Sequence, residues 1–161
     1  AEDGIRDSSV TGFRPVLFRS PTGPQFYLHG SPSRIPTGEE VLPASKVSTP
    51  EHIASRGQAN RDYFPDRVYL TPHPISALQY TWTDEDIANK SRHPSGYIHV
   101  VEPIGQIRKD NSSRDAIIAG SRHARGAKVV GSFPARAVIT GEVDSEEEAK
   151  AYQDYIKYLL R

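Results

Sequence analysis

Residues 26–33 read FYLHGSPS, and this stretch begins as an apolar strand that stops at a histidine followed by a glycine. A short run of aromatic and aliphatic residues is typical of a β-strand. Gly30 lacks a Cβ, so other groups can approach the backbone at this point. His29 therefore has two interpretations: a core histidine before a turn, or an imidazole at the edge of a ligand site.

The composition sets limits on the fold and on the binding partners. The chain has 161 residues, which suits one domain with a single core. Lys plus Arg and Asp plus Glu are each 20, so no general electrostatic attraction to nucleic acid or to anionic membranes is expected. The absence of cysteine excludes disulfides, thiolate metal sites and a cysteine nucleophile. The absence of methionine, even at position 1, fits a processed product or a piece of a longer chain.

The first half of the chain contains short strands and one long loop. Residues 1–12 are polar and are expected to form a tail or an edge extension, and Phe13–Phe18 is expected to form a short edge strand. RVYLT at 67–71 predicts a further strand. The proline-rich segment 31–66 predicts an ordered loop with one helical turn near 51–55. A loop of this length in a compact domain usually has a function.

Helices are predicted at two places in the second half. Apolar residues at helical spacing predict an amphipathic helix from Pro74 to about Asn89. Ser145 and Glu148 form a capping-box pattern before an apolar repeat, which predicts a helix at the C-terminus.

The remaining segments favour β-structure. GYIHVVEP at 96–103 predicts a strand, and the following GQIRKD predicts a short extended piece. Residues 128–143 also predict β-structure, with a break at Pro134, while 115–120 fits a helix or a strand. The predicted fold class is therefore α+β, with mostly antiparallel strands and few helices.

Three polar residues stand at the ends of predicted strands. They are His29 in YLHG, Tyr69 in RVYLT and Asp110 in GQIRKD. Each residue alone has an ordinary structural explanation, namely a core histidine, a cross-strand tyrosine and a turn aspartate. Their occurrence together, each with a specific flanking sequence, points to a common site.

The ordered set of motifs resembles the rifampin ADP-ribosyltransferase family, within the diphtheria-toxin-like ADP-ribosyltransferases. The motifs are FYLHGSPS, RVYLT, YIHVVEPIGQIRKD and PARAVITGEV, followed by the closing helix. The resemblance covers about residues 26–160 and implies a compact ADP-ribosyltransferase-like fold, with antiparallel strands around an NAD cleft. The expected organisation is an N-terminal extension or edge segment at 1–25 and a catalytic domain at 26–161.

The resemblance implies a mono-ADP-ribosyltransferase that uses NAD as co-substrate and needs no metal. It assigns catalytic roles to His29, Tyr69 and Asp110. Tyr69 would stack on the nicotinamide, His29 would bind a ribose hydroxyl, and Asp110 would stabilise the cation that develops at the ribose. The NAD-binding residues would be His29, Gly30, Tyr69 and Arg122, the last as a ligand of the pyrophosphate.

The sequence leaves the acceptor open. Arg108 and Lys109 precede Asp110, where the rifampin-type branch has an acidic stretch, so a basic flank replaces an acidic one. The expected acceptor would be a rifamycin-type small molecule, an RNA or a protein. A toxin domain, secreted or delivered, would also have an immunity or antitoxin partner, whereas a drug-modifying enzyme would be cytoplasmic; no membrane partner is expected. An NAD glycohydrolase and a non-catalytic NAD-binding module remain alternatives.

Overall fold

The computed structural model describes residues 2–8, 10–11, 26–51, 54 and 63–159. By its contacts the chain divides into two units. One unit is Ala1–Gln25 with Lys157–Arg161, and the other is Phe26–Ile156. In the first unit, β1 (Glu2–Ser8) pairs antiparallel with β2 (Val10–Thr11). The strand predicted at Phe13–Phe18 lies outside the described residues.

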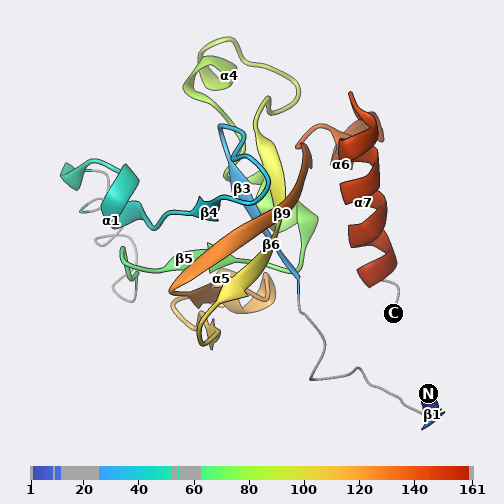
Figure 1. The fold of residues 1–161 in the computed structure, drawn as a ribbon. Helices are drawn as coiled ribbons and strands as arrows, with labels where there is room; N and C mark the ends of the chain where they lie inside the picture. Colours follow the sequence, from blue (N-terminus) through green and yellow to red (C-terminus); the bar gives the residue numbers. More distant parts are fainter. Residues whose placement is uncertain (1, 9, 12–25, 52–53, 55–62, 160–161) are drawn as a thin grey trace. The chain divides into compact units, whose positions relative to one another are not determined.

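A four-stranded antiparallel sheet forms the centre of the second unit (Figure 1). The β6–β9 pairing shifts register between Val100 and Val101, as a β-bulge does, and a bulge bends a strand and increases its twist. The strands, in their order across the sheet, are β3 (Tyr27–Ser31), β6 (Tyr97–Ile104), β9 (Gly126–Pro134) and β4 (Glu40–Val41).

A three-stranded antiparallel sheet continues the first one. Its strands, in order, are β5 (Val68–Leu70), β8 (Arg122–Ala124) and β7 (Arg108–Lys109). Leu28 of β3 and Thr71, directly after β5, exchange two backbone hydrogen bonds of 2.8 and 3.0 Å. The strands together make a curled half-barrel. The prediction of an α+β fold with mostly antiparallel strands and few helices is thus confirmed.

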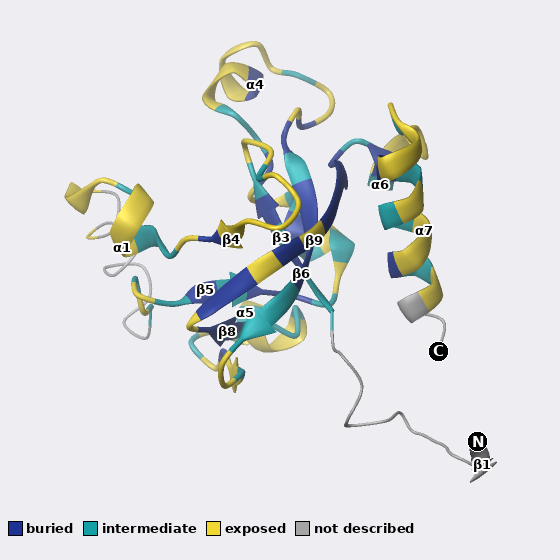
Figure 2. Cartoon of the chain, viewed as in Figure 1, coloured by how far each residue is buried: buried dark blue, intermediate teal, exposed yellow. Residues whose placement is uncertain are grey.

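The main core lies between the two sheets, because both contribute its side chains (Figure 2). Its buried members are Val41, Val68, Leu70, Val101, Ala124, Ala127 and Val129. Val101 and Val129, at the centre of the sheet, are fully buried. This apolar packing holds β5 in a fixed position, and Tyr27 at the start of β3 packs against it.

The C-terminal helix α7 (Glu146–Leu159) packs on β9. A Cβ at Gly131 would lie 2.8 Å from the Cβ of Ala151, so glycine permits a close approach of helix and strand. Phe133 and Tyr152 add an edge-to-face contact with ring centroids 5.0 Å apart. The predicted C-terminal helix is therefore confirmed.

The N-terminal cap of α7 differs in one detail from the capping box that the sequence predicts. The Ser145 hydroxyl accepts from the Glu148 N–H at 3.1 Å, as expected. The Glu148 carboxylate, however, accepts from the N–H of Asp144 at 3.0 Å. The carboxylate thus satisfies a donor one residue before the serine.

The single helix predicted at 74–89 is wrong, because two short helices occupy this segment. They are α3 (Pro74–Leu78) and α4 (Asp84–Ala88). The Thr83 hydroxyl accepts from the Asp86 N–H and the Asp86 carboxylate accepts from the Thr83 N–H, so a complete capping box starts a new helix there. The spacing of the apolar residues predicts one buried helix face, but Ile75 and Ile87 are 69% and 65% exposed and form no such face.

The β-structure predicted after Pro134 is also wrong. Helix α6 (Ala137–Thr140) follows β9, and Gly141 ends it with a left-handed conformation at φ 77°. The ambiguous segment 115–120 lies mostly in helix α5 (Arg114–Ile118), where the Ser113 hydroxyl accepts from the Ala116 N–H at 3.0 Å.

The predicted strands at 67–71 and 96–103 are confirmed as β5 and β6, and β7 lies in the predicted extended piece. The long proline-rich segment contains β4 and the short helix α1 (Ala44–Val47). Residues 51 and 54 of the predicted turn are helical, as is Pro50 directly before it, and the rest of that turn lies outside the described residues. No helix in the described ranges is long and apolar enough to cross a membrane.

Candidate functional site

One cavity of about 680 Å³ brings His29, Gly30, Tyr69 and Asp110 together. His29 and Gly30 line it from β3, Tyr69 from β5, and Asp110 from the end of β7. Residues of α1, α3 and α5 complete its walls. Three segments far apart in the sequence therefore meet around one space, because the curled sheet brings β3, β5 and β7 to it.

His29 is half-buried, and a hydrogen bond fixes its ring. Its Nδ1 lies 3.0 Å from the carbonyl oxygen of Tyr69, and a carbonyl only accepts, so Nδ1 carries the proton of this bond. Burial lowers the pKa of His29, against a smaller opposing effect of this hydrogen bond. A neutral ring protonated on Nδ1 leaves Nε2 with a lone pair that can accept from a ligand hydroxyl.

His99, on β6 directly opposite His29, fixes the backbone behind the site. It is fully buried, its Nδ1 donates to the carbonyl of His29 at 3.1 Å, and its Nε2 accepts from the N–H of Ile35 at 2.8 Å. Burial is the largest cause that lowers the pKa of His99 to about 4. The ring is therefore neutral at physiological pH and joins β3 to the loop that follows it.

Tyr69 belongs to a row of aromatic rings. Its ring centroid lies 5.6 Å from that of Tyr63, nearly parallel to it, and 5.5 Å from that of His123. Its hydroxyl accepts from the backbone N–H of Phe64 at 2.8 Å. The ring is thus held at both its face and its tip, and it forms a rigid aromatic wall of the cavity.

Asp110 is 8% exposed, and its carboxylate is held by donors on both oxygens. One oxygen accepts from the N–H of Ser112 at 3.1 Å and from the hydroxyl of the same serine, and the other accepts from the Ser121 hydroxyl at 2.8 Å. Its own N–H donates to the carbonyl of Ser121 at 3.0 Å. These bonds fix a carboxylate at the cavity wall, where it can act on positive charge without moving.

Gly30 has a steric reason to be glycine. A Cβ there would lie 2.1 Å from the carbonyl oxygen of Ala77 in α3, so the helix backbone occupies the space of a side chain. The backbone N–H and carbonyl of Leu28 are hydrogen-bonded to Thr71, so they point to the edge of β3 that faces away from β6. Because backbone groups alternate along a strand, those of Gly30 point to the same edge of β3, where the cavity lies.

Arg122 lies away from this cavity. It neighbours His123 on β8, and successive side chains of a strand point to opposite faces, so it faces away from the side of His123 and Tyr69. Its guanidinium donates to the carbonyls of Gly120 and Ser121, both at 3.0 Å. The position of Arg122 thus gives no support to the prediction that it binds a dinucleotide here.

Arg67 lines the cavity, although the sequence analysis assigns it no role. Its Nε–H donates to Nδ1 of His123 at 2.9 Å, and one Nη donates to the carbonyl of Gln106 at 3.2 Å. The only signal in the sequence is its position as the first residue of RVYLT, directly before β5. A guanidinium in a cavity is suited to phosphate or carboxylate oxygens.

The chemistry of the cavity is that of an organic ligand site. It combines an imidazole acceptor, an aromatic wall, a fixed carboxylate and a guanidinium. Within the described part of the chain, no group of three or more His, Asp or Glu side chains could hold a metal ion. Its volume lies within the range of about 300–1,000 Å³ of small-molecule sites.

Comparison with known proteins adds no assignment. No protein-family model matches the sequence, and a search of curated proteins finds no significant match. The geometry of the cavity and the motifs that surround it are therefore the basis for a function.

Proposed function

We propose that this protein is an NAD-dependent mono-ADP-ribosyltransferase, as its resemblance to the rifampin ADP-ribosyltransferase family implies. The observation that carries the proposal is the common cavity of His29, Tyr69 and Asp110. The imidazole accepts a hydrogen bond from a ribose hydroxyl, the phenol ring offers an aromatic surface, and the carboxylate supplies a negative charge. Cleavage of the nicotinamide–ribose bond requires these features.

The nicotinamide end of NAD fits the β3 edge. A carboxamide has a carbonyl group that accepts hydrogen bonds and an NH2 group that donates them. The Gly30 N–H and carbonyl face the cavity side of β3 as a matching pair. The nicotinamide ring packs against the Tyr69 wall. Arg67 can pair with the pyrophosphate, in the role that the sequence had assigned to Arg122.

The reacting ribose lies between His29 and Asp110. Nε2 of His29 accepts a hydrogen bond from a ribose hydroxyl. Asp110 stabilises the positive charge that develops as the bond to nicotinamide breaks. Nicotinamide leaves as a neutral base with the electron pair of that bond. The anomeric carbon then bonds the acceptor oxygen, whose proton is released through Asp110 to solvent.

The experiment is to measure nicotinamide release from NAD, with NAD binding measured by calorimetry. We expect the wild-type protein to release nicotinamide and Asp110→Asn to bind NAD but to release little. Absence of both binding and release in a folded protein would contradict the proposal. Release at the same rate with and without any acceptor would identify a glycohydrolase, and binding without release would identify a binding module.

A further inference from the structure

A second cavity, of about 190 Å³, adjoins the first at Asp110. Asp110 and Ser112 line both cavities. The residues that line the second cavity are Phe64, Lys109, Asp110, Asn111, Ser112 and His123. Any molecule bound in it therefore meets the carboxylate that the proposed function places beside the reacting ribose.

The second cavity is rich in hydrogen-bond donors. Nδ1 of His123 accepts from Arg67, so a neutral His123 ring carries its proton on Nε2. Burial and the charge of Arg67 both lower the pKa of His123 and so favour that neutral ring. Lys109 also lines the cavity, and the exposed Asn111 adds an amide. Arg108 pairs with His123 across β7 and β8 and so lies on the same face of the sheet as His123.

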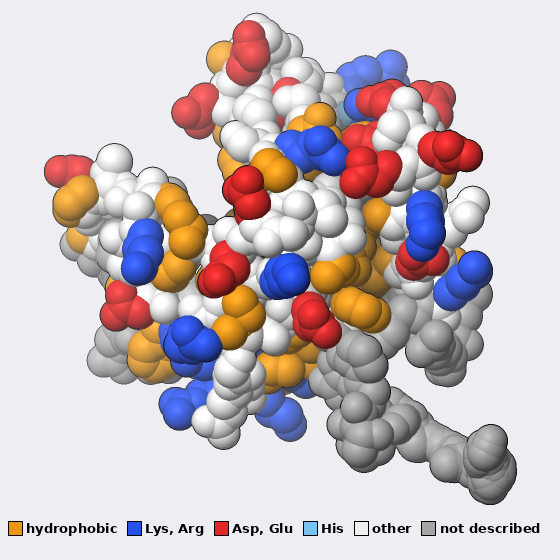
Figure 3. Space-filling model, viewed as in Figure 1, with side chains coloured by type: hydrophobic (Ala, Val, Ile, Leu, Met, Phe, Trp, Pro, Cys, Tyr) orange, Lys and Arg blue, Asp and Glu red, His pale blue; other side chains and the backbone are white. Residues whose placement is uncertain are grey.

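Basic side chains continue outward from this cavity. Arg108 and Lys109 of β7 are exposed, and so is Arg125 at the turn between β8 and β9. Lys and Arg side chains gather at the end of the molecule where β8 lies (Figures 2 and 3). Because the net charge of the chain is zero, this positive surface is a local feature.

An exposed aromatic ring stands at the same cavity. Phe64 is 50% exposed, and its ring centroid lies 5.4 Å from that of His123. Exposed aromatic rings beside basic residues are the features with which proteins bind single-stranded nucleic acids, by base stacking and phosphate contacts.

We infer that the second cavity is the acceptor site of the proposed transferase and that it binds single-stranded RNA. Phe64 stacks on a base, while Arg108 and Lys109 bind flanking phosphates. A ribose 2′-hydroxyl then reaches Asp110, its oxygen bonds the anomeric carbon from NAD, and its proton goes through Asp110 to solvent as nicotinamide leaves. An apolar drug would not use these cations, and DNA has no 2′-hydroxyl.

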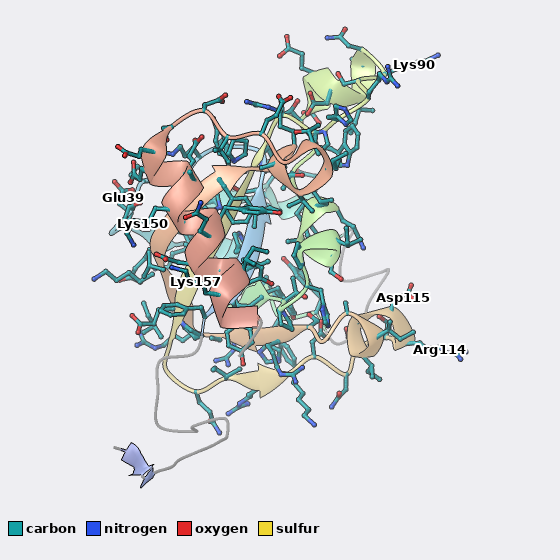
Figure 4. The ribbon with its side chains drawn as sticks, turned by 90° about the vertical axis from the view of Figure 1, so that its right-hand side faces the viewer. Glu39, Lys90, Arg114, Asp115, Lys150 and Lys157 are labelled. Atoms are coloured by element: carbon teal, nitrogen blue, oxygen red, sulfur yellow. The ribbon has the colours of Figure 1, made fainter. Side chains whose placement is uncertain are left out.

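The first test is binding of a fluorescent single-stranded RNA, measured by anisotropy without NAD, so that it does not depend on activity. We expect Arg108→Ala with Lys109→Ala to weaken binding at least tenfold and to reduce the salt slope by about 1.4, for two lost phosphate contacts. Phe64→Ala should weaken binding by about tenfold. The control is Arg92→Ala with Lys150→Ala, two exposed cations elsewhere (Figure 4 labels Lys150 on α7), which should not change binding.

The second test is transfer of radiolabel from NAD to RNA and to DNA of the same sequence. We expect label on RNA alone. The label should be lost in the Arg108 and Lys109 variant and retained in the Arg92 and Lys150 control variant. Nicotinamide release without RNA binding, or equal labelling of DNA, would overturn the acceptor inference alone. RNA binding without nicotinamide release would instead overturn the proposed function, and with it the transfer.

Discussion

At the residue scale, the fixed carboxylate of Asp110 has the most specific task in the proposed reaction. Its hydrogen bonds to Ser112 and Ser121 hold it at the cavity wall, and its negative charge matters most when the ribose becomes cationic. We expect Asp110→Asn to lower the turnover number for nicotinamide release by about 100-fold, because the amide has no charge. The dissociation constant for NAD should change far less.

Steady-state kinetics together with calorimetry separate these two effects. Glu39→Gln is the control, since Glu39 is an exposed acid elsewhere on the molecule (Figure 4). If Asp110→Asn keeps the full turnover number, Asp110 does not stabilise the transition state.

The two parts of the Tyr69 side chain have different roles and can be tested separately. Tyr69→Phe removes the hydroxyl, and with it the bond from the Phe64 N–H, and keeps the aromatic wall. Tyr69→Ala removes the wall, so we expect it to raise the NAD dissociation constant about tenfold, while Tyr69→Phe should raise it less than about threefold. Equal effects of both variants on NAD binding in calorimetry would show that the ring does not contact the ligand.

At the scale of elements, the contact of β3 with α3 decides how the cavity is shaped. Gly30→Ala would place a methyl group 2.1 Å from the Ala77 carbonyl, so α3 must move away from the strand. We expect this variant to lose about 3 kcal/mol of unfolding free energy and to bind NAD more weakly. Urea denaturation measures the first effect.

Gly126→Ala is the matched control on another strand, since a Cβ there meets its nearest neighbours at ordinary distances of 3.5 Å and more. It should cost much less stability. A Gly30→Ala variant as stable as Gly126→Ala would mean that α3 does not pack on β3 as described.

Elements that bury apolar side chains show this in their composition, so they could be predicted from the sequence. Elements whose bounds depend on local hydrogen bonds could not. Strands β5 and β6 bury apolar side chains in the main core, so their composition indicated them. The break between α3 and α4 depends on the reciprocal bonds of Thr83 and Asp86, which the apolar spacing of the segment concealed. For α6, the β-branched residues favour a strand, whereas the helix ends at Gly141, whose φ of 77° only the structure reveals.

The candidate site divides in the same way. His29, Tyr69 and Asp110 could be proposed because each lies beside a recognisable strand motif. Arg67 and His99 could not, since their roles depend on which side chains the curled sheet brings near them. The charge of Arg122 suits a phosphate ligand, but the alternation of side chains along β8 points it away from the cavity.

At the scale of the whole molecule, stability should depend on pH through histidines that folding keeps neutral. Burial lowers the pKa of His29, His99 and His123, whereas the unfolded chain binds protons near pH 6.5. The unfolded state thus gains protons first, so the unfolding free energy should fall as the pH drops below about 6.5. For His99 the loss should continue to about pH 4 and approach about 3 kcal/mol.

Urea denaturation over this pH range measures the effect. His99→Gln should be less stable at neutral pH but should show a shallower pH dependence, because no buried imidazole remains to be protonated. His93→Gln, at an exposed histidine, should retain the wild-type dependence. A His99→Gln variant with the full wild-type slope would assign the pH dependence to other groups.

The most direct test of the common site is a crystal structure of the protein with a non-hydrolysable NAD analogue. We expect the nicotinamide ring against Tyr69, and the adjoining ribose within about 3 Å of Nε2 of His29 and of the Asp110 carboxylate. An analogue bound outside the 680 Å³ cavity, or bound in it with its ribose away from both side chains, would contradict the proposed enzyme.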